Sequence, residues 1–488
     1  MAGLESKKKI ELILLSEKTP FSVSPLDSDV LDNLVIMEQI VGTLVKYGPE
    51  GSYEPFLAES WSVSNDEKKW TFKLRPGLID GRGTEITAEK LVYNLKRLLK
   101  IYSKTYSPPA FDQLEGWNDF TSGKDDNLGI SANRDLIEFN FRTRPSGVLE
   151  FLSMPYFGYY SDFDFDGLLW KDKTKITSTG AYRLLNYDEN KVVLEARNNW
   201  HTFLPKSASI VEIKYGVYSS TLNNHNSNLI ISYRGGNIGN IENIENLNVF
   251  KTTPSLLTTI ILSPKLRPFN DINIRKAFRN VIRNEIKYVN FGNEVDVTNT
   301  FYQNMSHLQL QIDDPAKSLE KLKSIKPEQL NLFISKLTNE NDKVAISKLL
   351  DRIFELMNWQ FKILTPELYG KDWIKDATSN HVFPIRISRV DIGGSPENWL
   401  INMMFCSKLG VSLPDPQGKI KNLVKDFEEN KINSIDEYLM RLHDSIEQDA
   451  TVIPIFHTQF KWLVSKSIDA SNFSQTMNIP RFDKIELK

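Results

Sequence analysis

The chain of 488 residues has little that would support thiol catalysis or a metal centre. Cys406 is its only cysteine, so neither a disulfide within the chain nor a cluster of thiolates is available. Cys406 lies in the apolar stretch INMMFCSKLG, which predicts a buried structural thiol. The six histidines are scattered, and no pair has the spacing of a zinc-binding helix. We therefore expect no metal and no cofactor.

Long apolar runs and an excess of one charge are also missing. No window approaches the roughly 20 apolar residues that a membrane-spanning helix needs. The formal net charge is −2, so no overall field favours nucleic acid or an anionic membrane as partner. The opening Met-Ala-Gly is compatible with a start added to a mature chain whose export signal has been removed.

Hydrolase and nucleotide-binding motifs are absent as well. The patterns G-x-S-x-G and H-E-x-x-H and the P-loop do not occur. The stretch RGGNIGN is rich in glycine but lacks the dinucleotide fingerprint. An enzyme is therefore the weaker interpretation.

The patterns that are present indicate an α/β protein of two or three domains. Trp70, Phe72 and Leu74 alternate with polar residues, which predicts a half-buried strand after a turn at Asn65. A helix capped by Thr87 should follow, with leucines at 91, 95, 98 and 99 on one face. Composition rich in Asn and Gly around residues 223–247 favours turns and loops.

From about residue 270 helices and strands alternate, which predicts a second α/β lobe. Residues 275–290 form one expected helix, and Asp314 with Pro315 should begin another. In the helix expected over 341–359, one broad face should carry Val344, Leu349, Ile353 and Met357. The stretches VFPIRISRVD and VIPIFHTQFKWLVS predict strands.

The order of several blocks resembles the large extracytoplasmic solute-binding proteins of peptide-type ABC transporters, bacterial family 5. These blocks are YEPFLAESWSVSNDEKKWTFKLRPGL with GTEITAEKLVYNLKRL, STGAYRLLNYDENKVVLEARNNW, RPFNDINIRKAFRNVIRNEI, DDPAKSLEKL, SPENWLINMMF and VIPIFHTQFKWLV. The resemblance covers nearly the whole chain.

The resemblance implies a two-lobed, periplasmic-binding-protein-like α/β fold with a ligand cleft between the lobes. The first lobe would comprise residues 1–45, 168–258 and 462–488, and the second lobe residues 259–461. Residues 46–167 would form an extra small α+β domain attached to the first lobe. Hinge closure of the two lobes would bury the ligand.

The implied function is non-enzymatic capture of a peptide or peptide-like solute, which is delivered to the permease subunits of an ABC importer. The protein would act as a monomer, in the periplasm or anchored outside the membrane, and would not bind nucleic acid. The alternative is a ligand-sensing receptor or regulator that uses the same fold without transport.

The resemblance also identifies candidate ligand contacts in the stretch PIRISRVDIGGSPENWL. In many peptide-binding relatives an aspartate four residues before the proline pairs with the α-ammonium group of the peptide. Aligned on Pro396, that position is Ile392, and Asp391 lies one residue earlier. Because one step along a strand reverses the side chain, Asp391 could replace that aspartate only if the strand end bulges or if the alignment contains a gap. Otherwise Asp391 would bind nearby backbone.

Further candidates from the resemblance are Arg386, whose guanidinium would suit a ligand carboxylate, and Ser388 on the same strand. A structural ion pair is equally open for Arg386. Trp399 and Trp117 would line the cleft or pack in the core. The loop TPFSVSPL, with Phe21, Ser22 and Ser24, would border the cleft.

Overall fold

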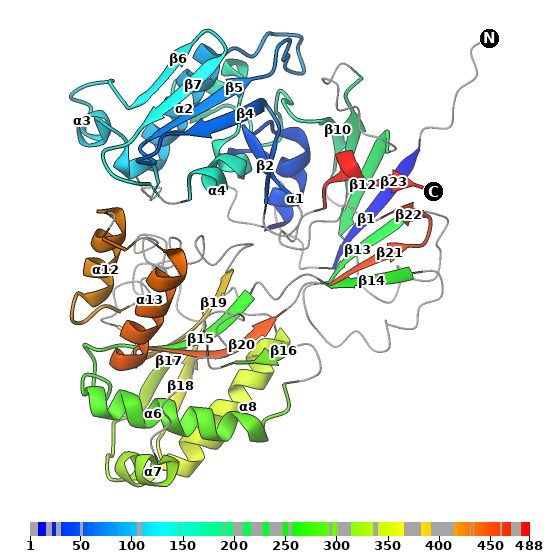
Figure 1. Ribbon diagram of the computed structural model, residues 1–488. Helices are drawn as coiled ribbons and strands as arrows, with labels where there is room; N and C mark the ends of the chain where they lie inside the picture. Colours follow the sequence, from blue (N-terminus) through cyan, green and yellow to red (C-terminus); the bar gives the residue numbers. More distant parts are fainter. Residues whose placement is uncertain are drawn as a thin grey trace. The chain divides into compact units, whose positions relative to one another are not determined.

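The chain divides into two compact units in a computed structural model. The residues that the structure describes are 8–15, 22–25, 31–48, 52–104, 110–145, 147–188, 191–198, 208–215, 228–233, 247–251, 256–291, 295–298, 300, 314–334, 340–365, 382–391, 414–429, 431–432, 434–458, 461–469 and 480–488. Unit 1 comprises Met1–Arg234, Ile238–Thr253 and Phe460–Lys488, and unit 2 comprises Gly235–Asn237 and Pro254–Gln459. Each unit is therefore built from separate stretches of the chain, and the C-terminal residues belong to unit 1 (Figure 1).

Unit 1 contains a seven-stranded mixed sheet. Its strands, in spatial order, are β10 (Tyr182–Tyr187), β11 (Lys191–Ala196), β12 (Ile210–Tyr215), β1 (Lys9–Leu15), β13 (Leu229–Tyr233), β21 (Lys461–Ser465) and β14 (Leu247–Lys251). Strand β1 runs parallel to both β12 and β13. The consecutive residues Leu12, Ile13 and Leu14 are all buried, as expected for a central strand that is covered on both faces.

The C-terminal segment packs against the N-terminal part of unit 1. The elements involved are α1 (Leu31–Ile40), β2 (Val45–Tyr47), β3 (Tyr53–Pro55), β22 (Ile468–Asp469), η10 (Phe482–Lys484) and β23 (Glu486–Leu487). Gln39 Nε2 donates to the Pro480 carbonyl at 2.9 Å, and its Oε1 accepts from the Phe482 amide at 3.3 Å. Residues far apart in sequence therefore share one packed layer.

A four-stranded antiparallel sheet with helix α2 forms a smaller α+β part of unit 1. Its strands, in spatial order, are β4 (Ala58–Val63), β5 (Lys69–Leu74), β7 (Leu136–Asn140) and β6 (Ile130–Asn133), and α2 spans Ala88–Tyr102. The Thr87 hydroxyl accepts from the Lys90 amide at 3.4 Å, and the four expected leucines are buried. The predicted strand, turn and capped helix are confirmed.

Short elements complete this part of the chain. They are η3 (Phe111–Gln113), α3 (Trp117–Ser122), α4 (Val148–Ser153), η4 (Pro155–Phe157), η5 (Asp162–Asp164), β8 (Phe165–Asp166) and β9 (Leu169–Trp170). An aromatic core connects them to the sheet. The Phe111 ring lies 6.2 Å from Phe139 and 5.1 Å from Phe157, measured between ring centroids.

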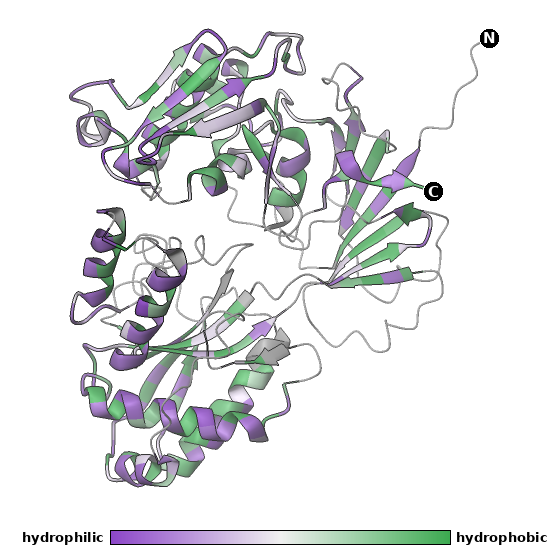
Figure 2. Ribbon diagram, in the orientation of Figure 1, coloured by the Kyte–Doolittle hydropathy of each residue, from purple (hydrophilic) through white to green (hydrophobic). Residues whose placement is uncertain are grey.

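Unit 2 contains a six-stranded mixed sheet with helices on one face. The strands, in spatial order, are β16 (Val295–Val297), β20 (Val452–Thr458), β15 (Leu256–Leu262), β19 (Ile385–Asp391), β17 (Leu330–Ile334) and β18 (Phe361–Leu364). The helical segments are α6 (Ile272–Glu285), η7 (Ile286–Tyr288), α7 (Pro315–Lys323), α8 (Glu340–Met357), α12 (Lys419–Glu428) and α13 (Ile435–Asp449). Ile260 and Ile387 of the sheet share one buried cluster with Phe278 of α6 and Leu350 of α8. In Figure 2 these two helices each show a hydrophobic and a hydrophilic side.

The helix expected from Asp314 is confirmed, because the Asp314 carboxylate accepts from the Ala316 amide at 2.9 Å. The expected helix over 275–290 starts earlier, at Ile272, and its last turn is the 3-10 segment η7. The place given to Val344 on the buried face of α8 is wrong, because 53% of this side chain is exposed. Five residues along an α-helix turn by about 140°, which separates Val344 from Leu349 and from the buried stripe.

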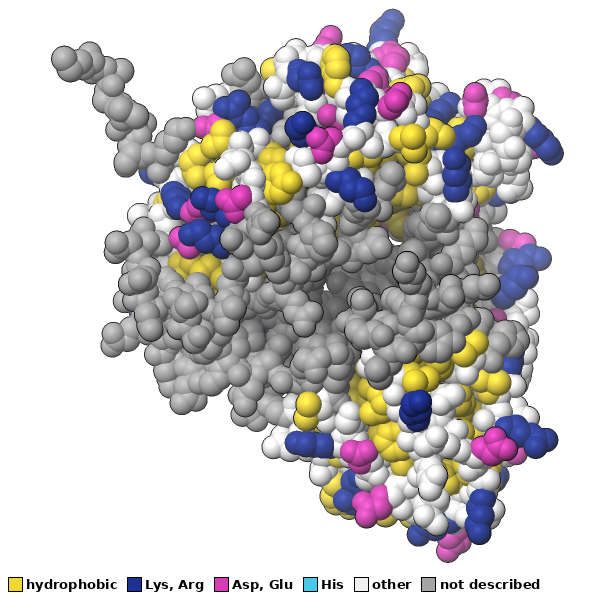
Figure 3. Space-filling model, turned by 180° about the vertical axis from the view of Figure 1, so that it is seen from behind, with side chains coloured by type: hydrophobic (Ala, Val, Ile, Leu, Met, Phe, Trp, Pro, Cys, Tyr) yellow, Lys and Arg dark blue, Asp and Glu magenta, His cyan; other side chains and the backbone are white. Residues whose placement is uncertain are grey.

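The surface agrees with the nearly balanced charge. Lys and Arg are interspersed with Asp and Glu over the described surface seen in Figure 3. Among the described helices, none is long and apolar enough to cross a bilayer. Residues 366–381, which precede β19, and the apolar stretch around Cys406 lie outside the described residues.

Candidate functional site

Ser22 and Ser24 lie in a loop of unit 1 that is held by several parts of the chain. Both serines are buried. The Ser22 amide donates to Asn33 Oδ1 at 3.3 Å, and the Val23 amide donates to the Lys173 carbonyl at 2.8 Å. The Ser24 amide donates to the Ser22 hydroxyl oxygen at 3.2 Å. The loop therefore has a defined backbone; Phe21 lies outside the described residues.

The end of helix α2 fixes the next residue of this loop. The Tyr102 hydroxyl lies 3.1 Å from the Pro25 carbonyl and 3.1 Å from the Tyr156 carbonyl. A hydroxyl has one proton to donate, so the two carbonyls share it. The loop is thereby tied to the small α+β part of unit 1, where Trp117 begins α3 and is buried beside Phe120.

In unit 2, Arg386 and Ser388 lie on one face of strand β19. Ile385 and Ile387 belong to the apolar cluster beneath the helices, so alternation places Arg386 and Ser388 on the opposite face. Arg386 pairs with Ile261 of β15 and with Phe333 of β17, whereas Ser388 pairs with Thr259. We call the face that carries these two residues the polar face of the sheet.

His457 belongs to the same polar face, although sequence reasoning missed it. On β20 it pairs with Leu257 of β15, which alternates in register with Thr259 and Ile261. Burial leaves His457 only 1% exposed. The sequence does place His457 in the predicted strand VIPIFHT. That stretch alone does not show which strand pairs with it, so the face on which His457 lies could not be predicted.

Burial dominates the electrostatics of Arg386. The side chain is 4% exposed, and burial lowers the pKa of its guanidinium to about 10. The group therefore keeps its positive charge at neutral pH. Arg386 has a partner within the protein, so an anionic ligand group would join or exchange with that partner. A buried guanidinium can bind a carboxylate by two parallel hydrogen bonds.

The backbone of β19 is regular to its end. Each residue from Ile385 to Asp391 pairs with β15 without a register shift, and Asp391 pairs with Leu256. The bulge that would let Asp391 replace the usual ligand-binding aspartate is therefore absent from this paired segment. Ile392 and Trp399 lie outside the described residues, as does the side chain of Asp391.

A buried cluster of charges in unit 1 was also missed by sequence reasoning. Lys46 Nζ binds Glu38 Oε1 at 2.7 Å, and Arg481 Nη2 binds Asp483 Oδ2 at 2.6 Å. Both cations flank the Phe56 ring, at 4.9 Å and 5.6 Å from its centroid. All its charges come from unit 1, so this cluster holds the C-terminal segment in place. We call these five residues the C-terminal clamp.

A row of buried arginines forms a second missed cluster, in unit 2. Arg275, Arg279 and Arg283 recur at helical spacing on α6. Arg279 and Arg283 bind the Glu447 carboxylate of α13 at 3.2 Å and 2.6 Å. The sequence signal was visible in RKAFRNVIR, where a buried row of cations indicates an acidic helix alongside.

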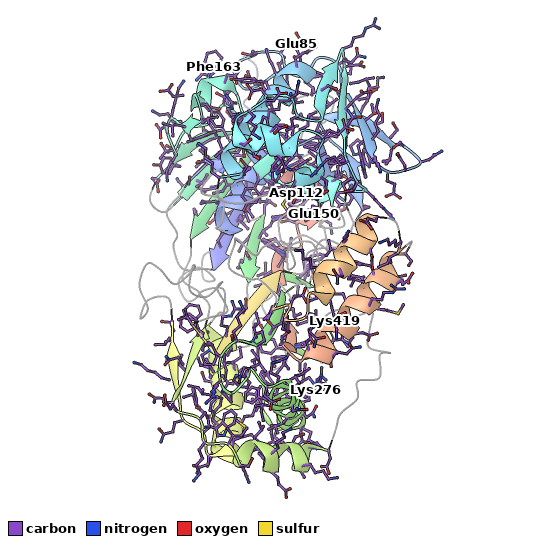
Figure 4. All side chains as sticks on the ribbon, turned by 90° about the vertical axis from the view of Figure 1, so that its left-hand side faces the viewer. Glu85, Asp112, Glu150, Phe163, Lys276 and Lys419 are labelled. Atoms are coloured by element: carbon purple, nitrogen blue, oxygen red, sulfur yellow. The ribbon has the colours of Figure 1, made fainter. Side chains whose placement is uncertain are left out.

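Within the described part of the chain, no group of three His, Cys, Asp or Glu side chains could hold a metal ion. The chemistry that these described groups offer is recognition. The polar face supplies a buried cation and hydroxyls, and the loop of unit 1 supplies serines on a fixed backbone. Figure 4 shows the side chains of both units.

Comparison with known proteins gives a consistent result. The family model described as bacterial extracellular solute-binding proteins, family 5 Middle, matches residues 52–345. The periplasmic oligopeptide-binding protein OppA of Haemophilus influenzae is 25% identical over 374 residues, which are 68% of this chain and 64% of that protein. The alignments thus span about half to two thirds of the first curated relatives.

Solved structures match almost the full length. The murein tripeptide-binding protein MppA of Escherichia coli has a TM-score of 0.79 at 16% identity and covers 99% of each chain. Haemophilus influenzae OppA in complex with the peptide RPPGFSPFR has a TM-score of 0.75 at 19% identity, and covers 99% of this chain and 100% of that chain. At these identities the structures show a common two-lobed fold.

Proposed function

Because the chain belongs to family 5 of the bacterial extracellular solute-binding proteins, we propose that it captures a peptide or peptide-like solute outside the cytoplasmic membrane and delivers it to an ABC importer. The observation that carries this proposal is the family match over residues 52–345. The name of the OppA relative, which is an oligopeptide-binding protein, supports a peptide as the ligand. The site then works by binding, without turnover of the solute.

The proposed division of labour follows the resemblance. Residues 1–45, 168–258 and 462–488 act as the first lobe, residues 46–167 as its extra small domain, and residues 259–461 as the second lobe. The monomer closes over the ligand by a hinge, and the ligand shifts the equilibrium towards the closed state. The closed protein is then recognised by permease subunits, in the periplasm or at the outer face of the membrane.

Arg386 is the proposed charged anchor for the ligand. It is buried, remains cationic at neutral pH and lies on the polar face with Ser388. A ligand carboxylate would satisfy such a guanidinium in a water-poor site. Ser22, Ser24 and Trp117 of unit 1, with Phe21 and Trp399, remain proposed neutral contacts.

The ligand should not depend on the usual pairing between its α-ammonium group and an aspartate. Ile392 stands at the expected acidic position, and the regular ladder through Asp391 supports the same conclusion. A buried ammonium without a carboxylate costs several kcal/mol. We therefore propose a ligand that has an anionic group and no requirement for a free amine.

Native mass spectrometry of the purified protein tests the capture of a solute directly. A ligand that copurifies appears as added mass, and its fragmentation shows whether it is peptide-like. Calorimetric titration with free and N-acetylated peptides then tests the anchor. Acetylation should leave the affinity unchanged, while Arg386→Ala weakens binding by roughly 2–5 kcal/mol, the scale for unpairing a buried charge.

A matched control is Arg352→Ala in the same unit, because the Arg352 side chain is 44% exposed and pairs with Glu285. This change should leave binding unaltered. Tight binding of free peptides that is lost on acetylation would refute the anchor. A sensing receptor is the alternative function, and uptake of labelled ligand by cells with and without the gene distinguishes it from import.

A further inference from the structure

Helices α12 and α13 of unit 2 pack on each other as a pair. The Phe427 ring of α12 lies 4.6 Å from the Tyr438 ring of α13, measured between ring centroids. At the other end of the pair, Lys419 Nζ donates to Gln448 Oε1 at 3.0 Å. Figure 1 shows the two helices side by side, and Figure 4 labels Lys419 at the start of α12. Because they are joined at both ends, we treat them as one body and call it the helix pair.

The helix pair lies outside the main apolar cluster of unit 2. That cluster joins the sheet to α6, α7 and α8, and it contains no described side chain of α12 or α13. Leu442 and Ile446 of α13 are buried but are not members of it. We therefore expect the cluster to stay packed if the helix pair separates from α6.

Charged groups connect the helix pair to α6. Arg283 donates to both oxygens of the Glu447 carboxylate of α13, at 3.0 Å and 2.6 Å. Arg279 donates to one of these oxygens at 3.2 Å. At the end of α13, Arg275 Nε donates to the Asp449 carbonyl at 2.8 Å. We call these contacts the junction. Buried charge pairs of this kind stabilise only while their geometry is kept.

His443 lies within the junction. It stands one turn before Glu447 on α13 and is only 2% exposed. Among the described groups, Glu447 and Asp444 of α13 favour a charge on the imidazole, whereas Arg283 of α6 opposes it. Burial outweighs the two carboxylates and lowers the pKa of His443 below its ordinary value. The imidazole is therefore neutral at pH 7 while the junction is packed.

We propose that His443 is a proton-sensitive latch, and that protonation of its imidazole releases the helix pair from α6. A charged imidazole in the packed junction would lie near Arg283 and would lack the water that solvates it in an open state. In the open state the same side chain takes up a proton from solvent on one ring nitrogen. Acid should therefore shift the equilibrium towards release.

The pH range of the latch follows from the ordinary pKa of histidine, which is 6.5. A base whose pKa is lowered in the packed state stabilises that state fully above pH 6.5, and this stability is lost as the pH falls below 6.5. A single proton changes the opening equilibrium by at most about tenfold per pH unit. The population of the released state should thus rise by up to about tenfold per pH unit in mild acid.

Asp449 cannot produce the same effect, because its response has the opposite sign. Burial raises the pKa of this carboxyl, so the packed state binds the proton more tightly than an open state does. Protonation of Asp449 would therefore strengthen the packed state in acid. Release in mild acid consequently points to His443.

Release of the helix pair would act on strand β20. Two residues, Ala450 and Thr451, separate α13 from β20, and the Thr451 carbonyl accepts from the Leu262 amide of β15 at 2.8 Å. Strand β20 pairs with β15, which carries part of the polar face. The latch does not rest on ligand capture, however, so failure of one proposal leaves the other unaffected.

Hydrogen exchange of the full chain, followed by mass spectrometry, tests the latch. Protection of the α13 amides is measured between about pH 7.5 and about pH 5.5, and is corrected for the intrinsic effect of pH on exchange. Peptides from α8 and from α2 are the references in unit 2 and unit 1. We expect α12 and α13 to lose protection about three- to tenfold over this range, while both references keep theirs.

Three variants separate the latch from general destabilisation. His443→Gln keeps a polar side chain that does not titrate, so its α13 protection should be independent of pH. His457→Gln is the matched control, because His457 is also a buried histidine of unit 2, and its α13 protection should follow pH like the unchanged protein. Glu447→Gln should lower α13 protection about tenfold or more at every pH, because this change removes the carboxylate that binds two arginines.

Nuclear magnetic resonance of the histidine rings reports the titration itself. Comparison of the unchanged protein with His443→Gln assigns the His443 signal, which should titrate below the ordinary value of 6.5. Titration at or above this value would overturn the proposal. It is also overturned if α8 loses protection together with α13, which means unfolding of the whole unit, or if His443→Gln retains the pH dependence of α13.

Discussion

Two buried guanidinium groups, Arg481 in unit 1 and Arg386 in unit 2, show opposite balances between burial and charge. Burial by itself would lower the pKa of Arg481, but Asp483, Glu38 and Glu54 raise it above its usual value. At Arg386 burial prevails, and the pKa falls to about 10. At Arg481 the carboxylates of the protein therefore outweigh burial, whereas at Arg386 burial has the larger effect.

This difference separates a structural cation from a cation that can serve a ligand. Arg481 binds Asp483 in the C-terminal clamp, and its Nη1 also lies 3.6 Å from Glu54. Such a group has no capacity left for an outside anion. Arg386 lies on a strand face beside the hydroxyl of Ser388, and an anionic ligand group would stabilise its charged form.

The largest expected effect comes from breaking the clamp. Asp483→Asn leaves the buried Arg481 without its carboxylate partner, which should lower the free energy of unfolding by about 3–5 kcal/mol. Denaturation by urea measures this change. Asp172→Asn is the control, because this side chain is partly exposed and its amide oxygen can still accept the hydrogen bonds from Thr174, so the change should matter much less. Equal stability of the two variants would show that the clamp is not structural.

The next effect distinguishes the two arginines. Arg386→Met keeps a side chain of similar length and removes the guanidinium. The same change should weaken ligand binding by roughly 2–5 kcal/mol. Arg481→Met should do the reverse, lowering stability and sparing the affinity of the folded protein. Calorimetry and urea denaturation on both variants measure the two quantities.

A smaller effect concerns a partly exposed ion cluster on the seven-stranded sheet. Burial tends to raise the pKa of Glu212, but Lys9, Lys191 and Lys214 lower it to about 2. A carboxylate with a depressed pKa in the folded state stabilises above its ordinary value of 4.5, and this stability is lost as the pH falls to about 2.

Glu212→Gln should therefore cost about 1–2 kcal/mol near neutral pH, after allowance for solvent screening at the half-exposed Lys9. The difference from the unchanged protein should vanish as the pH approaches 2. Unfolding curves recorded at several values between about pH 7 and about pH 2 measure how this stability difference depends on pH. A difference that does not depend on pH would contradict the role of the three lysines.

Local patterns allowed much of the fold to be predicted. Alternation predicted strand β5, and the caps at Thr87 and Asp314 marked the starts of α2 and α7. The buried position predicted for Val344 is wrong because the prediction used the hydrophobicity of this residue and not its angular position on α8. Helix α12 was not predicted, and Gly418 precedes it without a side-chain cap.

The site was less accessible from the sequence, for a physical reason. Alternation along β19 separates Arg386 from the apolar core residues, and this could be read from one strand. The C-terminal clamp could not be predicted in this way, because Arg481 contacts the carbonyl of Tyr47, which lies 434 positions away in the sequence. Contacts over such distances depend on the tertiary fold, and no local pattern encodes them.

A thermodynamic cycle tests the central claim most directly. The ligand found by mass spectrometry, or a tightly bound peptide, is compared with its amidated form, which lacks the carboxylate. The account predicts that amidation weakens binding to the unchanged protein by roughly 2–5 kcal/mol and has little effect on Arg386→Met, because the same contact is already lost. An equal loss in both proteins would place the carboxylate elsewhere and would contradict Arg386 as the ligand anchor.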